Sequence, residues 1–564
     1  MNSSKSRIIL EEQKNNFSYR KDKSNLNITF NRIAFIFFIF FIISLIYSIH
    51  LIHLGSRKNN ITNENFFSKD SKKFYRADII DRNNEYLSKT ISSIDIGISP
   101  SQIIDEKKLI LNLKYIFPNK DYSKIKRKIK RGKFFYFEKK VSEENYEKLM
   151  QLGDKSIEPR ESIIRLYPQK NLFSHIIGQI DNDNNGISGL EKSQNENLRN
   201  ITKPLRLTVD TNIQYLIRNE LIKFNKIFRT KGSASILMNI HNGEIISFVS
   251  LPDFNLNERK KIFDKNFINR VSKGTYELGS VFKPFTFAAA LDMDLIDPST
   301  KFLNLPKSIE CAGFPIREYD LKIPSNLTAE QILVRSGNIG SVRIAQKIGE
   351  NNFKIFLEKI GVIGDINFDI EEVAIHKDFS MGKCKLATAS FGHGISTTLL
   401  QLAKGYSVIS NGGYTVNPKL IFKDFEKVQN EKKMILKKDV SEKLVKILRK
   451  IVTDDEGTAG LANIDGYEIA GKTGTAEQVI DGQYSKTKIN TFASVFPSPK
   501  PEFVFIVMLD SPRGSPDYVY NYRNKKGSFT GTPFNTAGWT SVEVAGQIME
   551  KIGPILATKY LQVY

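Results

Sequence analysis

A serine and a lysine lie three residues apart at Ser280 and Lys283, shortly before a run of small residues from Ala288 to Ala290. If a helix begins near Ser280, the two side chains share one helix face and lie about one turn apart. The first turn of a helix also leaves backbone N–H groups without partners beside the hydroxyl. The amine can take the hydroxyl proton and the N–H groups can stabilise an oxyanion, so the spacing predicts an activated serine nucleophile.

The Ser-x-x-Lys spacing is not specific by itself, because it recurs at Ser18, Ser123, Ser380 and Ser485. Two later segments distinguish the pair at Ser280 from these repeats. They are Ser336-Gly337-Asn338 and Lys472-Thr473-Gly474-Thr475, and the sequence Lys-Thr-Gly-Thr occurs once in the chain. In this order and at domain-scale spacing, the three segments resemble the triple signature of penicillin-recognising serine acyltransferases.

Length and composition are those of a globular protein with more than one domain. The chain has 564 residues, of which 40% are hydrophobic and 26% charged, so two or three domains with sizeable cores are expected. A formal charge of +22 could indicate a nucleic-acid partner, but no zinc-finger spacing or RNA-binding signature accompanies it. We therefore attribute the charge to basic surface spread along a lysine-rich chain and expect no nucleic-acid partner.

The two cysteines, Cys311 and Cys384, are too few for a disulfide framework or a metal site. The sequence leaves open whether they pair with each other. The His, Asp and Glu residues show no metal-ligand spacing either, so neither a metal nor another cofactor is expected.

An uncharged apolar segment from residue 33 to residue 54 is long enough to span a bilayer. A cleaved signal peptide would have a shorter apolar region ending in small residues, whereas this segment ends in Leu51-Ile52-His53-Leu54. We expect an uncleaved single-pass anchor, with a basic tail at 1–32 before it and a polar linker at 55–75 after it. Basic residues flank the segment on both sides, so charge alone orients it only weakly.

Four further segments resemble the non-catalytic pedestal of the class B penicillin-binding proteins. They are Arg76 to Asn83, Arg165 to Pro168, His175 to Gly178 and Gly186 to Glu191. The resemblance implies an α+β protein in which a mixed, elongated pedestal (dimerisation-type) domain at 76–205 precedes a penicillin-binding transpeptidase domain at 206–564. The latter has a central antiparallel sheet flanked by helices. The tail is then cytoplasmic and the catalytic domain periplasmic, because cell-wall chemistry occurs outside the inner membrane.

Local patterns predict the elements around the three motifs. Asn242-Gly243 between two apolar runs is typical of a β-hairpin, with strands at 233–238 and 245–250. Helix-like patterns precede Ser336 and cover 397–410 and 541–555, whereas strands are expected at 467–479, 491–496 and 503–510. The Gly-, Pro- and Asn-rich stretch 512–531 predicts a long loop.

Two other features have a plain structural interpretation. The basic run from Lys124 to Lys133 could meet an anionic partner such as lipid headgroups, but we expect a solvated helix face. His393, in a glycine-flanked segment, is expected to be a structural loop histidine.

The resemblance implies a role for each motif residue. Ser280 would be the nucleophile and Lys283 its general base, which requires burial and a second cation at Lys472 to lower the pKa of the Lys283 amine. Ser336 would relay a proton to the leaving amine, and Asn338 would hold Lys283 and the substrate backbone.

The same resemblance places the terminal carboxylate of the substrate against Lys472, Thr473, Gly474 and Thr475. The backbone N–H groups of Ser280 and Thr475 would form the oxyanion hole. The chain departs from the family at Leu278, where Pro is frequent, and at Gly337, where Ser is frequent. Neither change removes a reacting atom.

The implied function is a peptidoglycan D,D-transpeptidase that cross-links stem peptides ending in D-Ala-D-Ala to a neighbouring amine and is inhibited by β-lactams. Ser336 to Gly340 and Phe391 to Ile395 resemble the septal, FtsI-type members, which implies a role at the division septum beside a SEDS-type glycosyltransferase and other divisome membrane proteins. The alternatives are an elongation-type class B transpeptidase, a membrane-anchored β-lactamase or carboxypeptidase, and a non-catalytic β-lactam sensor or scaffold.

Overall fold

The computed structural model describes residues 32, 34–52, 75–201, 203–258, 265–375, 382–422, 432–480, 483–522 and 527–561. The chain divides into two compact units, Met1–Phe74 and Tyr75–Tyr564. The first unit contains a helix at Ala34–Ile52 with a mean hydropathy of 2.6, whose length and composition suit a membrane span. This helix agrees with the anchor predicted at 33–54. Nearly all of the predicted tail and linker lies outside the described residues.

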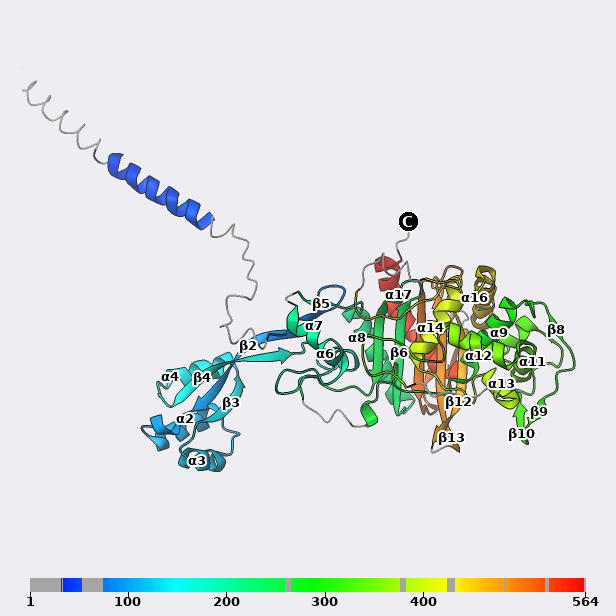
Figure 1. Cartoon of the computed structure of the whole chain (residues 1–564), viewed down its shortest axis with the longest axis horizontal. Coiled ribbons are helices and arrows are strands. Elements are labelled where there is room, and N and C mark those ends of the chain that lie inside the picture. The colour runs from blue at the N-terminus through cyan, green and yellow to red at the C-terminus, as the bar shows by residue number, and fades with distance from the viewer. Residues whose placement is uncertain are drawn as a thin grey trace, which may run out of the picture. The chain divides into compact units, whose positions relative to one another are not determined.

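The second unit begins with the pedestal region, residues 75–206, which is built on one mixed sheet (Figure 1). The strand order is β3-β2-β1-β5, and β4 also pairs with β2. All pairs are antiparallel except β1 with β5. The strands are β1 Ile79–Ile80, β2 Tyr86–Ile98, β3 Phe135–Val141, β4 Ile157–Leu166 and β5 Leu205–Arg206.

The pedestal region contributes to two hydrophobic cores. Residues 94–157, which we call the head, enclose a small core of their own. The head contains α2 Glu106–Ile116, α3 Tyr122–Lys130 and α4 Glu143–Gln151. The rest of the region joins the main core of the unit through β1 and through the short helices α5 Ser174–Ile177, α6 Gly189–Ser193 and α7 Asn195–Asn200.

A buried ion network holds the base of the pedestal region together. The Glu191 carboxylate accepts hydrogen bonds from the guanidinium groups of Arg76 and Arg165, and all three side chains are almost wholly buried. Burial alone would raise the pKa of Glu191, but the charges of Arg165 and Arg76 outweigh it and lower that pKa. Three of the four segments that resemble a class B pedestal therefore meet at one carboxylate.

The remainder of the unit is organised around an antiparallel five-stranded sheet of order β12-β13-β14-β6-β7. Its strands are β6 Gly232–Asn239, β7 Ile245–Leu251, β12 Ala470–Ile480, β13 Gln483–Phe496 and β14 Phe503–Asp510. β7 and β14 are buried along their whole length, as expected for strands covered on both faces. The hairpin predicted around Asn242-Gly243 is the β6–β7 pair, and β12 is an edge strand.

Helices cover this sheet (Figure 1). α8 and α17 pack against each other and against the sheet, whereas α14, α16 and α9 form a second group of packed helices. These helices are α8 Thr211–Ile227, α9 Lys283–Asp292, α14 Leu399–Ser410, α16 Lys438–Thr453 and α17 Ser541–Lys559. Asp210 caps the start of α8, and Thr398 with Gln401 forms a capping box on α14.

A smaller group of elements lies beside α9. It comprises α10 Ala329–Val334, α11 Asn338–Ile348, α12 Glu350–Lys359, α13 Lys383–Ala389, the hairpin β9 Ser308–Cys311 with β10 Phe314–Arg317, and the pair β8 Lys301–Phe302 with β11 Leu327–Thr328. A disulfide joins Cys311 in β9 to Cys384 in α13. The pairing that the sequence left open is therefore formed in the structure.

One local prediction needs correction. The stretch 512–531 is not an irregular loop throughout, because it contains the hairpin β15 Val519–Asn521 with β16 Ser528–Thr530. Tyr520 is fully buried, packs edge-on against Trp539 and shares a hydrogen bond with Thr532. This one aromatic anchor stabilises a short hairpin within a Gly- and Pro-rich stretch.

We predict that Glu191→Gln destabilises the second unit by roughly 3–5 kcal/mol, because it leaves two buried guanidinium groups without a counter-charge. Urea unfolding of the purified protein measures this change. The control is Glu371→Gln, which removes an exposed ion pair with Lys192 and should cost about 0–1 kcal/mol. Equal losses in the two variants would contradict the structural importance of the buried network.

Candidate active site

Ser280 lies in a single 3-10 turn, Gly279–Phe282, that leads directly into α9. Pro284 lies in the first turn of α9, where its missing N–H costs nothing. Gly279 has a φ of +61°, and a Cβ there would lie 2.8 Å from the carbonyl oxygen of Thr475. The serine predicted as a nucleophile is thus fixed by a tight turn and remains partly accessible.

Lys283, one turn further on, is completely buried. Its Nζ donates hydrogen bonds to the Ser336 carbonyl oxygen, to the Ser336 hydroxyl at 3.1 Å and to Oδ1 of Asn338 at 2.8 Å. Burial lowers the pKa of Lys283 to about 7, and the negative charge of Glu318 opposes this change. With a pKa of about 7, a substantial fraction of the amine is unprotonated near neutral pH.

Ser336 connects the two lysines of the site. It lies between α10 and α11 with a φ of +58°, a left-handed conformation that is uncommon outside glycine and that marks local strain. Its hydroxyl oxygen accepts hydrogen bonds from Lys283 and from Nζ of Lys472, the latter at 2.8 Å. Both lone pairs are used, so the hydroxyl proton is left to donate to a further group.

Lys472 is the buried amine of β12. Its Nζ also donates to the carbonyl oxygen of Thr473 at 3.1 Å. Burial, together with the charge of Lys283, lowers the pKa of Lys472 well below its usual value. A second amine therefore lies beside Lys283 and is connected to it through the Ser336 hydroxyl, and its role in lowering the pKa of Lys283 stays a prediction.

The Thr-Gly-Thr part of β12 runs alongside the serine turn. A Cβ at position 474 would lie 2.2 Å from the carbonyl oxygen of Leu278, so only glycine allows this close approach. The Thr473 hydroxyl shares a hydrogen bond with Thr458 at 2.7 Å, and the Thr475 hydroxyl accepts one from the Ala537 N–H at 2.9 Å. Gly474 thus allows the strand and the serine turn to pack closely. The two threonine hydroxyls are held by hydrogen bonds to residues outside β12.

Glu318 is a site residue that the sequence analysis missed. Its carboxylate accepts hydrogen bonds from the backbone N–H groups of Asn338 at 2.7 Å and Ile339 at 2.9 Å, at the start of α11. The neighbouring Arg317 carbonyl accepts from Nδ2 of Asn338 at 2.9 Å, which orients that amide so that its Oδ1 faces Lys283. The hairpin carrying Glu318 is tied to α13 by the Cys311–Cys384 disulfide.

His393 packs beside this site without a charge. Its ring lies 5.2 Å from that of Phe391 and 6.2 Å from that of Tyr484. Burial and the charge of Lys283 lower the pKa of His393 to about 4, so the ring is neutral at pH 7. Its Nδ1 is buried and has no hydrogen-bond partner among the described residues, so the structural role expected for this histidine stays a prediction.

The structure thus brings all three motifs together around one hydroxyl, that of Ser336. The arrangement offers an accessible serine, a buried amine with a pKa near neutrality, and a second amine connected to it through a hydroxyl that can pass on a proton. These are the parts that serine acyl transfer needs. In the part of the chain that the structure describes, no group of His, Cys, Asp or Glu side chains could hold a metal ion.

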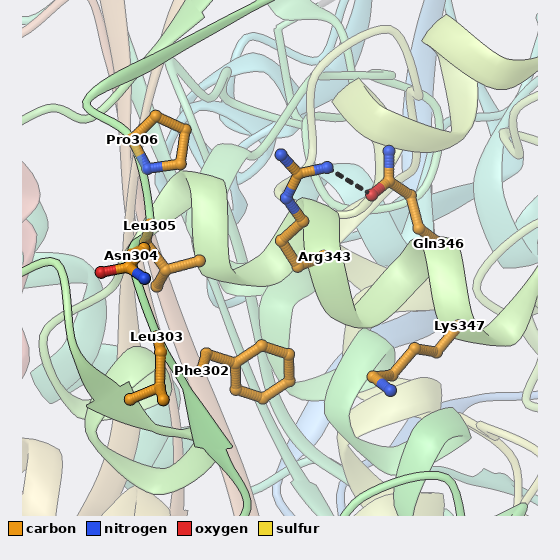
Figure 2. A pocket seen from close by; sticks show the side chains of 8 residues that line it. All are labelled: Phe302, Leu303, Asn304, Leu305, Pro306, Arg343, Gln346 and Lys347. Carbon is orange, nitrogen blue, oxygen red and sulfur yellow. Dashed lines mark hydrogen bonds between the residues drawn. The ribbon is translucent and has the colours of Figure 1, made fainter.

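A separate cavity of about 420 Å³ lies on α11, away from the motif contacts (Figure 2). It is lined by Phe302 to Pro306 on one side and by Arg343, Gln346 and Lys347 on the other. Arg343 donates a hydrogen bond to Gln346 at 2.9 Å. None of the predicted site residues lines this cavity, so the candidate active site is defined by the polar contacts of the motifs.

Comparison with known protein families agrees with this site. Residues 233–528 match the penicillin binding protein transpeptidase domain, and residues 72–221 match the penicillin-binding protein dimerisation domain. The chain therefore belongs to the penicillin-binding transpeptidases, and the presence of both domains makes it a class B penicillin-binding protein.

The individual relatives have low sequence identity to this chain but match most of its length. The chain is 26% identical over 500 residues to a probable peptidoglycan D,D-transpeptidase FtsI of Caulobacter vibrioides, covering 86% of this chain and 82% of that protein. It is 27% identical over 485 residues to the stage V sporulation protein D of Bacillus subtilis, covering 78% and 75%. The fold is similar to penicillin binding protein 3 of Mycobacterium tuberculosis, with a TM-score of 0.62 at 20% identity over 85% of this chain and 96% of that one.

We predict that Glu318→Gln moves the pH dependence of acylation by a penicillin to lower pH. The carboxylate raises the pKa of Lys283, so its removal lowers that pKa and the amine is neutral in more acidic solution. The maximal rate should fall as well, because an amide cannot accept from both N–H groups as the carboxylate does. Rate constants measured from pH 5 to pH 9 give both quantities.

Asp320→Asn is the matched control, since it removes a carboxylate two residues away that accepts its hydrogen bond from the Lys322 N–H instead of from Asn338. Its pH midpoint should equal that of the wild type. A midpoint that stays fixed in Glu318→Gln, or that moves to higher pH, would show that Glu318 does not act on Lys283.

Proposed function

We propose that this protein is the peptidoglycan D,D-transpeptidase of the division septum and that it cross-links stem peptides through an acyl-enzyme on Ser280. The observation that carries the proposal is the buried Lys283 amine, held by Ser336 and Asn338 one helical turn from a partly accessible serine. A pKa near 7 lets this amine both accept and return a proton at neutral pH.

In the first half-reaction, Ser280 attacks the carbonyl carbon between the two D-Ala residues of the donor peptide, and Lys283 takes the hydroxyl proton. The oxyanion lies against the backbone N–H groups of Ser280 and Thr475. The amide bond breaks, an ester to Ser280 remains, and the Ser336 hydroxyl passes a proton to the departing D-Ala amine. In the second half-reaction the amine of a neighbouring stem attacks the ester, forms the cross-link and restores the serine.

The donor peptide would bind along the β12 strand. Among the described residues β12 pairs with β13 alone, so its other edge can offer backbone groups to an extended chain. Lys472, Thr473 and Thr475 lie along it and can donate hydrogen bonds to the terminal carboxylate, while Asn338 can reach the peptide backbone. A β-lactam would occupy the same place and acylate Ser280, and its slow release would make it an inhibitor.

We predict that the purified protein forms a stable one-to-one penicillin adduct and that Ser280→Ala abolishes it. Intact-mass spectrometry detects the adduct. Ser485→Ala is the control, because Ser485 and Lys488 repeat the Ser-x-x-Lys spacing outside the site and this change should leave the adduct intact. An adduct that forms and disappears within seconds with release of hydrolysed drug would instead indicate a β-lactamase. An adduct in Ser280→Ala would show that Ser280 is not the nucleophile.

The assignment to the septum rests on the resemblance of Ser336 to Gly340 and of Phe391 to Ile395 to FtsI-type proteins. The FtsI name of the Caulobacter relative favours the septal assignment. The identity to a sporulation protein is similar, so sequence identity alone does not separate the septal members from other class B proteins. A septal enzyme would be anchored in the inner membrane by Ala34–Ile52, with its catalytic domain in the periplasm and its pedestal and transpeptidase domains divided near residue 205. Its partners would be a SEDS-type glycosyltransferase and other divisome membrane proteins.

Depletion of the protein in its own cell is expected to block septation and produce filaments, because septal cross-linking is lost while elongation continues. Microscopy of the depleted cells measures this outcome. A fluorescent fusion should localise to mid-cell, and a Ser280→Ala fusion should localise there without restoring division. Rounded or widened cells, with the fusion spread along the side wall, would favour the elongation-type alternative.

A further inference from the structure

The head carries a concentrated positive charge that the transpeptidase reaction does not use. Between Lys120 and Lys140 the chain has ten lysines and arginines and two acidic residues. Six of the ten form a continuous set on α3 and just after it, which we call the cationic face: Lys126, Arg127, Lys128, Lys130, Arg131 and Lys133.

The structure determines which side of α3 is buried. Tyr122, Ile125 and Ile129 pack into the small core of the head, so the helix is held by these three side chains. All six residues of the cationic face are exposed. The other side of α3 is therefore exposed to solvent, as the sequence analysis expected. All the charged residues within α3 are positive.

Local acids do not neutralise this charge. The two acidic residues of the segment already pair with cations outside the cationic face, Asp121 with Lys124 and Glu138 with Lys120. Among the described residues, none of the six has an acidic partner. Like charges three and four residues apart destabilise a helix, so a face without acidic partners reduces the stability of the head, and a counter-charge would offset this.

We propose that the cationic face binds the anionic phospholipid headgroups of the bilayer that anchors the chain. The anchor helix ends at Ile52, and the 22 residues from 53 to 74 can extend over at most about 75 Å, so the second unit is tethered to that membrane. A tether of this length gives even a weak surface contact a high effective concentration. Clusters of four to eight Lys and Arg on an amphipathic helix such as α3 are typical of anionic-lipid binding.

The head also presents apolar side chains that suit a lipid surface. Leu111 and Tyr115 lie four residues apart on α2 and are 68% and 87% exposed, and Ile104 just before that helix is 90% exposed. A headgroup layer accepts both kinds of side chain, because apolar groups enter the acyl boundary while lysines and arginines meet the phosphates. Binding would limit how far the catalytic unit can move from the membrane.

Lysine footprinting of the full chain in proteoliposomes tests this proposal. A membrane-impermeant amine reagent is applied to vesicles of pure phosphatidylcholine and to vesicles containing phosphatidylglycerol, and labelling at each lysine is read by mass spectrometry. Lys126, Lys128, Lys130 and Lys133 should label roughly tenfold more slowly in the anionic vesicles. Lys359 and Lys446, exposed on the transpeptidase part, are internal controls and should label at equal rates in both.

Raising the salt to 0.5 M should restore labelling of the cationic face, because screening shortens the reach of these charges. In Lys126→Glu/Lys130→Glu the protection of Lys133 should be lost, whereas Lys359→Glu/Lys446→Glu, which changes the charge equally, should retain it. Equal labelling of the cationic face in the two vesicle types would overturn the proposal. So would protection that appears only when an acidic protein or RNA is added, whatever the lipid.

Discussion

Burial of the Lys283 amine is the constraint on which the rest of the site depends. A buried ammonium is costly unless charged partners compensate, and the three atoms that Lys283 contacts are neutral oxygens. Glu318 supplies one negative charge behind Asn338, without direct contact to the amine. The balance leaves a pKa of about 7, so the amine is neutral often enough to take a proton and basic enough to keep it.

Because this pKa depends on burial, elements far apart in the sequence must pack closely around Lys283. The serine turn, β12 and the start of α11 all contact Lys283 or its partners, and close backbone approach at Gly279 and Gly474 brings the first two together. The strained backbone of Ser336 directs both its carbonyl and its hydroxyl oxygen to Lys283. A loosened contact at any of these places would admit water, raise the pKa of the amine and leave it protonated.

Much of the fold could be predicted because its signals are local or carried by motifs. The α+β architecture, the apolar N-terminal helix and the β6–β7 hairpin are confirmed. Glu318 could not be found, because its role depends on a hairpin folding back onto α11, which no local pattern records. The Cys311–Cys384 pairing and the hairpin around Tyr520 are likewise non-local contacts. The roles of Ser280, Lys283 and the other motif residues stay predictions, although the structure brings those residues together.

The protonation of Lys283 is the most direct measure of the central claim. Lysine labelled with carbon-13 at Cε gives an NMR signal that reports the charge of each amine, and Lys283→Arg identifies the signal of this residue. The structure predicts that this signal titrates with a pKa of about 7. A signal that shows the amine still fully protonated at pH 9 would contradict the assignment of Lys283 as the general base.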